Sequence, residues 1–218
     1  MAGSSPLIPK HGAYRKLKSF QLAQLVYDLT VHFCEQYVPR SSRTKDQMVQ
    51  AARSGVQNIA EGSQASGTSK KTELKLTNVA RASLEELRLD YEDFLRQRGL
   101  MLWEGEHPCL VRFKERRVSS LMEFRQWVAE ELRLVEGKTD LHGRARTDTD
   151  NKMAAQHIKR PDVSLVQTLA ANGALSLLNL TCYLLDRQIA SQARAFEMEG
   201  GFTERLYKVR SEYRKKQR

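Results

Sequence analysis

Apolar side chains recur every three or four residues along most of the chain, which is the period of an amphipathic α-helix. Only 5 prolines and 12 glycines occur in 218 residues, and this scarcity disfavours a β-rich, turn-dense fold. The pattern therefore predicts an all-α protein. The expected helices cover residues 19–38, 45–61, 70–98, 108–135, 163–196 and 201–218.

The helix expected over 19–38 has an unusually wide apolar surface. Leu22, Leu25, Leu29 and Phe33 fall on one face, and further apolar side chains extend this face beyond half of the circumference. One packing surface does not need so wide an arc. Either this helix is central in the fold or its second flank meets another subunit.

Residues 163–185 contain no charged side chain, and the stretch is long enough to cross a bilayer. However, 8 of its 23 positions are polar or glycine, which is a poor composition for a membrane span. We therefore interpret this stretch as a central or interface helix of a bundle, and we expect no membrane partner.

The net charge of +10 is concentrated at the two ends of the sequence. Residues 1–60 and 201–218 each carry a net charge of +5, whereas the two segments between them are close to neutral. This asymmetry favours an anionic partner, although a basic tail kept for solubility is the simpler alternative. The candidate phosphate-binding residues are Arg15, Lys16, Lys18, Arg40, Arg43, Lys45, Arg205, Lys208, Arg210, Arg214, Lys215, Lys216 and Arg218.

Sequence motifs of the common enzymes and metal sites are missing from the chain. The three cysteines, Cys34, Cys109 and Cys182, are far apart and show no C-x-x-C spacing, which argues against both a disulfide framework and a zinc site. The N-terminus lacks the apolar core of a signal peptide. We therefore expect a cytoplasmic protein that is not an enzyme and needs no cofactor and no metal.

One polar group interrupts the apolar face of the helix over 45–61. Asn58 and Glu61 lie one turn apart, and buried side chains of this kind would need partners such as Arg53 or Arg81. We expect a buried network that sets the helix register, with Gly62 ending the helix. A direct role of these residues in nucleic-acid binding is the alternative.

Three segments carry a resemblance to a known family. They are F-Q-L-A-Q-L-V-Y-D-L-T, then Q-M-V-Q-A-A-R-S-G-V-Q-N-I-A-E-G, then N-V-A-R-A-S-L-E-E-L. Over about residues 18–100 they resemble bacterial four-helix-bundle proteins, which include those encoded in intervening sequences of large-subunit ribosomal RNA genes and the accessory variability protein of diversity-generating retroelements. The later segments 171–188 and 200–210 look like the suffix-bearing branch of that family.

This resemblance implies an antiparallel four-helix bundle whose fourth helix is 163–196, with an inserted helix over 108–135 and a basic C-terminal helix. It also implies a homo-pentameric barrel that binds RNA or DNA and, in retroelements, a reverse transcriptase. The expected parts are a basic arm (1–18), the bundle (19–200) with a flexible linker (137–161), and a basic suffix (201–218).

Three functions remain open from the sequence. The first is a non-enzymatic, oligomeric nucleic-acid-binding scaffold that assists a reverse transcriptase or another nucleic-acid enzyme and contacts phosphates without reading bases. No aromatic-rich stacking platform is visible, so specific recognition of single-stranded bases is not expected. The second is a protein-interaction module whose basic helix binds an acidic protein, and the third is an enzyme with an unrecognised site.

Overall fold

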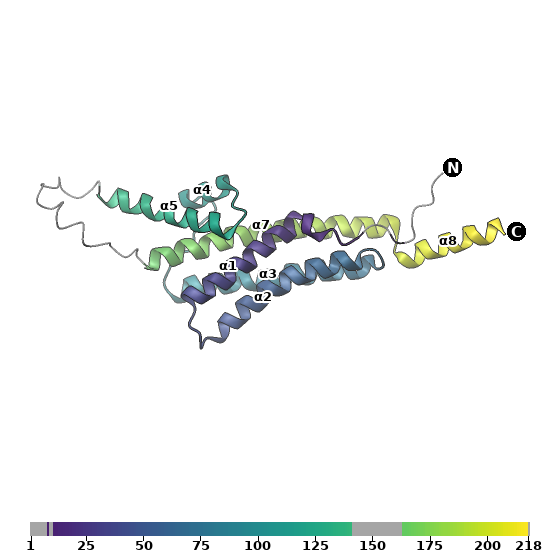
Figure 1. The fold of residues 1–218 in the computed structure, drawn as a ribbon, viewed down its shortest axis with the longest axis horizontal. Helices are drawn as coiled ribbons and strands as arrows, with labels where there is room; N and C mark the ends of the chain where they lie inside the picture. The colour runs from purple at the N-terminus through teal and green to yellow at the C-terminus, as the bar shows by residue number, and fades with distance from the viewer. Residues whose placement is uncertain (1–7, 9–10, 141–162, 218) are drawn as a thin grey trace, which may run out of the picture. The chain divides into compact units, whose positions relative to one another are not determined.

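The computed structural model describes residue 8, residues 11–140 and residues 163–217. Within these ranges every regular element is helical, so the predicted all-α class is confirmed (Figure 1). The elements are a 3-10 helix η1 (Tyr14–Lys16) and the α-helices α1 (Lys18–Tyr37), α2 (Arg43–Ala65), α3 (Lys70–Gln97), α4 (Pro108–Arg116), α5 (Leu121–Asp140), α7 (Val163–Glu199) and α8 (Phe202–Lys216).

The chain forms two compact units. The first unit combines Met1–Asp90 with Leu177–Arg218, and the second is Tyr91–Ser176. The helices α3 and α7 each contribute one part to each unit, because both boundaries fall inside these helices.

In the first unit α1, α2, α3 and the later part of α7 form an antiparallel four-helix bundle. Four side-chain contacts join these helices in a closed ring. They are Cys34 Sγ to Met48 Sδ (3.8 Å, α1 to α2), Ser54 Oγ to Ser83 Oγ (2.9 Å, α2 to α3), Arg81 Nε to Asp186 Oδ1 (3.0 Å, α3 to α7) and Ser19 Oγ to Gln188 Oε1 (2.8 Å, α1 to α7).

Small residues bring α2 and α3 close together. A Cβ atom at Gly55 would lie 2.6 Å from Leu84 Cδ2, and a Cβ atom at Gly62 would lie 3.2 Å from the backbone oxygen of Glu73. Both glycines are buried, and α2 continues past Gly62 to Ala65. The expectation that Gly62 ends the helix is therefore wrong: its missing side chain makes room for α3 instead.

The second unit contains the end of α3, the helices α4 and α5 and the start of α7. The segment predicted as one helix over 108–135 is two helices here. Arg117 adopts a left-handed conformation with φ of 50°, and Ser120 Oγ accepts a hydrogen bond from the Glu123 backbone N–H (3.2 Å). The Glu123 carboxylate in turn accepts one from the Ser119 backbone N–H (2.7 Å). This Ser-x-x-Glu capping pattern starts a new helix.

An aromatic cluster fills the second unit. The rings of Phe113, Phe124 and Trp127 lie with their centroids between 4.5 and 5.7 Å apart. A Cβ atom at Gly173 of α7 would lie 2.8 Å from Phe124 and Trp127, so this glycine lets the rings pack directly on the helix backbone.

The helix α7 begins where the sequence predicts the fourth bundle helix and continues to Glu199, where Gly200 with φ of 69° ends it. It contains a window that is apolar enough to cross a membrane, and 72% of that window is buried inside the protein. Such burial is typical of a core helix.

The predicted boundaries differ at two further places. The expected arm over 1–18 contains η1 and the first residue of α1, and its residues 1–7, 9 and 10 lie outside the described residues. Residues 137–140 of the expected linker belong to the last turn of α5, and most of the remainder lies outside the described residues.

Candidate nucleic-acid interface

Several arginines of the helical body contact carboxylates. We call them the paired arginines, namely Arg81, Arg88, Arg96, Arg112 and Arg116. Because their guanidinium groups already have anionic partners, binding a phosphate would require each of them to give up such a contact.

The most buried of these contacts lies between α4 and α5. Arg112 Nε donates a hydrogen bond to Glu131 Oε1 (2.7 Å), and the Glu131 residue is only 2% exposed. Burial by itself would raise the pKa of the Glu131 carboxyl, but hydrogen bonds from Arg112 and Cys109, together with the positive charge of Arg112, hold this pKa below its ordinary value. The pair is therefore ionised at neutral pH.

A second network joins α3 to α7 within the bundle. Arg81 contacts Glu85 on its own helix and Asp186 on α7, and Glu85 also accepts a hydrogen bond from Arg88. The hydrogen bond from Arg88 is the main reason why the pKa of Glu85 is lowered. This network fixes the register of α3 against α7.

The candidate phosphate-binding residues of the arm and of the loop before α2 are in a different situation. Arg15, Lys16, Lys18, Arg40 and Arg43 are exposed, and Lys45 is half-buried. No carboxylate of the described residues lies within 4.0 Å of their charged groups, although the Arg15 guanidinium lies 5.2 Å from the Tyr14 ring centroid. These side chains can bind an anion without losing an ion pair.

The arm and the loop lie at opposite ends of the bundle. Lys18 is the first residue of α1, whereas Arg40 follows its last residue, Tyr37. A helix of 20 residues is about 30 Å long, so the two groups of cations cannot contact the same phosphate. A nucleic acid that reached both would run along the bundle for roughly nine nucleotide steps.

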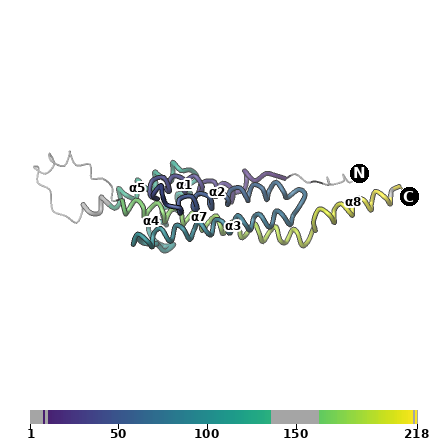
Figure 2. The backbone as a smooth tube through the Cα atoms, turned by 90° about the horizontal axis from the view of Figure 1, so that it is seen from below, coloured from purple at the N-terminus to yellow at the C-terminus, as the bar shows by residue number. Residues whose placement is uncertain are grey.

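The third group of candidates lies on α8, which follows α7 after Gly200 and Gly201 (Figure 2). The Glu204 carboxylate accepts a hydrogen bond from the Gly201 backbone N–H (2.8 Å) and so caps the start of the helix. Four candidate cations of this helix are exposed and have no carboxylate partner among the described residues. They are Lys208, Arg210, Arg214 and Lys215.

The remaining candidates of the suffix are different. Arg205 is half-buried, and its Nε and Nη2 atoms are enclosed without a hydrogen-bond partner among the described residues. Arg205 is therefore not an exposed cation like its neighbours. Arg218 and the side chain of Lys216 lie outside the described residues. The ten exposed or half-exposed cations of arm, loop and α8, without Arg205, are called the unpaired cations below.

The polar motif of α2 takes part in helix packing, but with other partners than expected. Asn58 Nδ2 donates hydrogen bonds to the backbone oxygen (2.9 Å) and to Oγ (3.1 Å) of Ser54, and Ser54 Oγ contacts Ser83 Oγ of α3. Arg53 and Glu61 are exposed. The expected partner Arg81 is held by Glu85 and Asp186, so the predicted arginine-centred network does not form.

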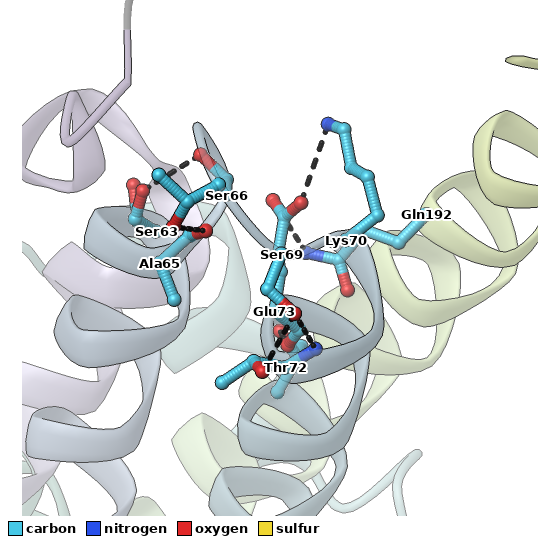
Figure 3. Close-up of polar contacts among 10 residues, drawn as sticks. Ser63, Ala65, Ser66, Ser69, Lys70, Thr72, Glu73 and Gln192 are labelled. Atoms are coloured by element: carbon cyan, nitrogen blue, oxygen red, sulfur yellow. Dashed lines mark hydrogen bonds and ion pairs between the residues drawn. The ribbon is translucent and has the colours of Figure 1, made fainter. Parts of the chain in front are cut away.

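Sequence reasoning missed the polar contacts that shape the turn between α2 and α3 (Figure 3). Ser69 Oγ accepts a hydrogen bond from the Thr72 backbone N–H (3.1 Å) and caps α3. The Glu73 carboxylate receives Lys70 Nζ (3.3 Å) and Gln192 Nε2 of α7 (3.2 Å). Ser69 directly precedes the amphipathic segment of α3, and this position in the sequence indicates a helix cap. The contact with Gln192 depends instead on how α7 packs against α3, which the local sequence does not determine.

A shallow polar groove of about 450 Å³ lies between α2 and α3. Arg43, Asp46 and Glu86 contribute charges of both signs to its lining, which also includes Ser54 and Ser83. The two carboxylates outnumber the one guanidinium, so the groove itself does not favour binding of a phosphate. Arg43 is the one lining residue of this groove that belongs to the candidate phosphate-binding residues.

The three cysteines are free and buried. Burial raises the pKa of the Cys34 thiol to about 12 and the pKa values of the Cys109 and Cys182 thiols to about 11, so all three are protonated at neutral pH. Among the described residues, no three His, Cys, Asp or Glu side chains are grouped in a way that could hold a metal ion.

Comparison with known proteins adds one match. Residues 16–100 match the model of the 23S rRNA-intervening sequence protein family. The match runs from η1 to just beyond α3 and includes the α2 motif with Asn58 and Gly62, but it covers less than half of the chain. No curated protein and no solved structure matches the chain. The segments α4, α5, α7 and α8 are therefore outside the similarity.

Proposed function

We propose that the protein is a non-enzymatic nucleic-acid-binding scaffold whose unpaired cations contact phosphates. The observation that carries this proposal is the contrast between two sets of cations. The paired arginines contact carboxylates, whereas the unpaired cations, of which all but Lys45 are exposed, have no such partner among the described residues. A polyanion neutralises these charges, and the release of its counterions drives binding.

The family match makes RNA one of the ligands that we propose, because the matching family is named after an intervening sequence of 23S rRNA. The role we assign is that of a cytoplasmic accessory protein to a reverse transcriptase or another nucleic-acid enzyme. The proposal covers DNA as well, because phosphate contacts do not by themselves distinguish the two polymers.

The scaffold is proposed to be a homo-oligomer, with five subunits as the expected number. Support comes from large apolar side chains that the chain leaves exposed within the bundle unit. Leu89 of α3 is 53% exposed, and Leu180 and Tyr183 of α7 are 46% and 55% exposed. A second subunit that covered these side chains would gain hydrophobic stabilisation.

The second candidate is a protein-interaction module, and the exposed Val209 of α8 (46%) favours it, because an acidic protein could cover both the apolar and the basic side chains of this helix. Nucleic acid would then compete only weakly for the same surface.

The test is a salt titration of the binding of single-stranded RNA and DNA of equal length to the full chain and to a 201–218 deletion, with the mass measured by light scattering. The scaffold predicts binding by an oligomer that weakens steeply with salt, and weaker binding by the deletion. If the full chain binds neither polymer at low salt, the scaffold proposal is wrong, and an acidic protein partner becomes the better explanation.

A further inference from the structure

Three tyrosines are exposed among the described residues: Tyr183 of α7 (55%) and, with a larger exposed fraction, two tyrosines of α8. Tyr207 is 74% exposed and Tyr213 is 64% exposed. In contrast, Phe33 and Trp127 are only 2% exposed and Tyr91 is fully buried. Burying an aromatic ring stabilises a complex more than burying most other side chains does. A ligand that covered the two open rings of this short helix would therefore be bound more tightly.

These tyrosines share one third of the helix circumference with two of the unpaired cations. At 100° per residue, the directions run from Tyr213 through Arg210 and Arg214 to Tyr207 within an arc of about 120°. The two tyrosines are separated by about 9 Å along the axis, since each residue adds 1.5 Å. Each ring can therefore accept a separate planar group.

The acidic residues of α8 lie outside this arc. Glu204 projects about 60° from Tyr207, on the side away from Tyr213, and Glu212 projects about 100° from Tyr213, on the side away from Tyr207. The arc thus combines two open rings and two guanidinium groups with no carboxylate, which favours a ligand that is both aromatic and anionic.

We propose that α8 binds single-stranded nucleic acid, with Tyr207 and Tyr213 each stacking on one base and with Arg210 and Arg214 holding the neighbouring phosphates. The inference rests on the proposed function, and it specifies single-stranded nucleic acid as the form that the C-terminal suffix (201–218) binds. In a duplex the bases are stacked on one another and their faces are closed, whereas a single strand offers them to aromatic side chains. The sequence alone did not reveal this surface, because only the structure shows that both rings are uncovered.

An anionic membrane is the other partner that such a helix could take, since interfacial helices also combine basic and aromatic side chains. Lys208 and Lys215 project from the side opposite Tyr213, but the other two unpaired cations of α8, Arg210 and Arg214, lie between the two tyrosines, and this arrangement favours the strand. On an interfacial helix the apolar and the basic side chains occupy opposite faces.

The test uses the full chain, a uridine 20-mer as the single strand, a 20-base-pair RNA duplex, and vesicles that contain phosphatidylserine. The variant Tyr207→Ala/Tyr213→Ala is compared with the matched control Tyr207→Phe/Tyr213→Phe, which keeps both rings. We expect the alanine variant to lose roughly 10-fold or more per ring in affinity for the single strand, with duplex affinity and salt dependence unchanged. The phenylalanine control is expected to bind like the unmodified chain.

The possible failures are distinguishable. If the alanine variant binds the 20-mer with unchanged affinity and a steep salt dependence, the stacking inference is wrong while the scaffold proposal stands. If the alanine substitutions weaken only vesicle binding, the helix is a membrane element and the inference is wrong. If the unmodified chain binds neither RNA, the scaffold proposal itself fails. Circular dichroism of both variants checks that α8 remains helical.

Discussion

The paired arginines of the helical body and the unpaired cations of the arm, the loop and α8 carry the same charge but differ in their contacts. Arg112 contacts a carboxylate that is 2% exposed, and Arg81 joins two helices through Asp186. Lys18 and Arg40 have no carboxylate partner among the described residues. The charges of the first set are held by carboxylates of the fold, whereas the second set leaves its charge available to a partner.

The largest expected effect comes from removing unpaired cations of α8. Replacing Lys208, Arg210, Arg214 and Lys215 by Gln should lower nucleic-acid affinity roughly 100-fold or more near 0.1 M salt, and should reduce the slope of log K against log salt by about 3. Fluorescence anisotropy at several salt concentrations measures both quantities. Urea unfolding of the bundle should be unchanged, because these side chains form no ion pair with the part of the chain that the structure describes. An unchanged slope would show that α8 does not contact phosphates.

The next effect is on stability. The substitution Arg112→Met leaves the Glu131 carboxylate buried without its cation, and we expect a loss of about 2 kcal/mol in the free energy of unfolding. This figure lies below that for a fully buried pair, because the Arg112 side chain is 42% exposed. Urea denaturation measures the loss. Nucleic-acid affinity should remain that of the unmodified chain, and a parallel fall in affinity would mean that Arg112 also binds phosphate.

The same pair makes stability depend on pH. Because the pKa of Glu131 is lower in the folded chain than its ordinary value of 4.5, the stabilisation by ionised Glu131 is present above pH 4.5 and is lost as the pH falls through the folded pKa. Thermal melts between pH 3 and pH 7 should show this loss in the unmodified chain. The Arg112→Met variant should lack that part of the pH dependence, and an identical profile in both proteins would contradict the assignment.

The smallest expected effect concerns an exposed pair. Arg96 and Asp93 contact each other at 2.8 Å, but both side chains are more than half exposed. The substitution Arg96→Gln should therefore change the free energy of unfolding by less than about 0.5 kcal/mol. A loss of more than 1 kcal/mol in urea denaturation would show that exposed ion pairs contribute more to this fold than the comparison assumes.

The sequence predicts the helices well because their apolar period is long and regular. For α1 and α3 the boundaries agree with the structure to within one residue at each end. It missed the break between α4 and α5, although Ser120 and Glu123 carried a capping signal, because the apolar period continues across the break. A capping motif can therefore mark a helix boundary even where the apolar period of the sequence is uninterrupted.

The partners of the polar residues were less predictable. Arg81 contacts Asp186, which is 105 residues away, and no local pattern fixes the register between α3 and α7. Tyr213 lies on the same apolar stripe of α8 as Phe202 and Leu206 and yet is 64% exposed, which the spacing alone does not show. Exposure depends on which other helices reach a surface, and this is a property of the tertiary arrangement.

The most direct test of the comparison uses two matched variants, Arg15→Gln/Lys18→Gln and Arg96→Gln/Arg116→Gln. Each removes two positive charges, so long-range charge effects are the same and only the local contacts differ. The slope of log K against log salt for RNA binding is measured for both. We expect the slope to fall by about 1.5 for the unpaired cations and to stay unchanged for the paired arginines. Equal reductions in both variants would contradict the account, because pairing with carboxylates would then not decide which cations bind nucleic acid.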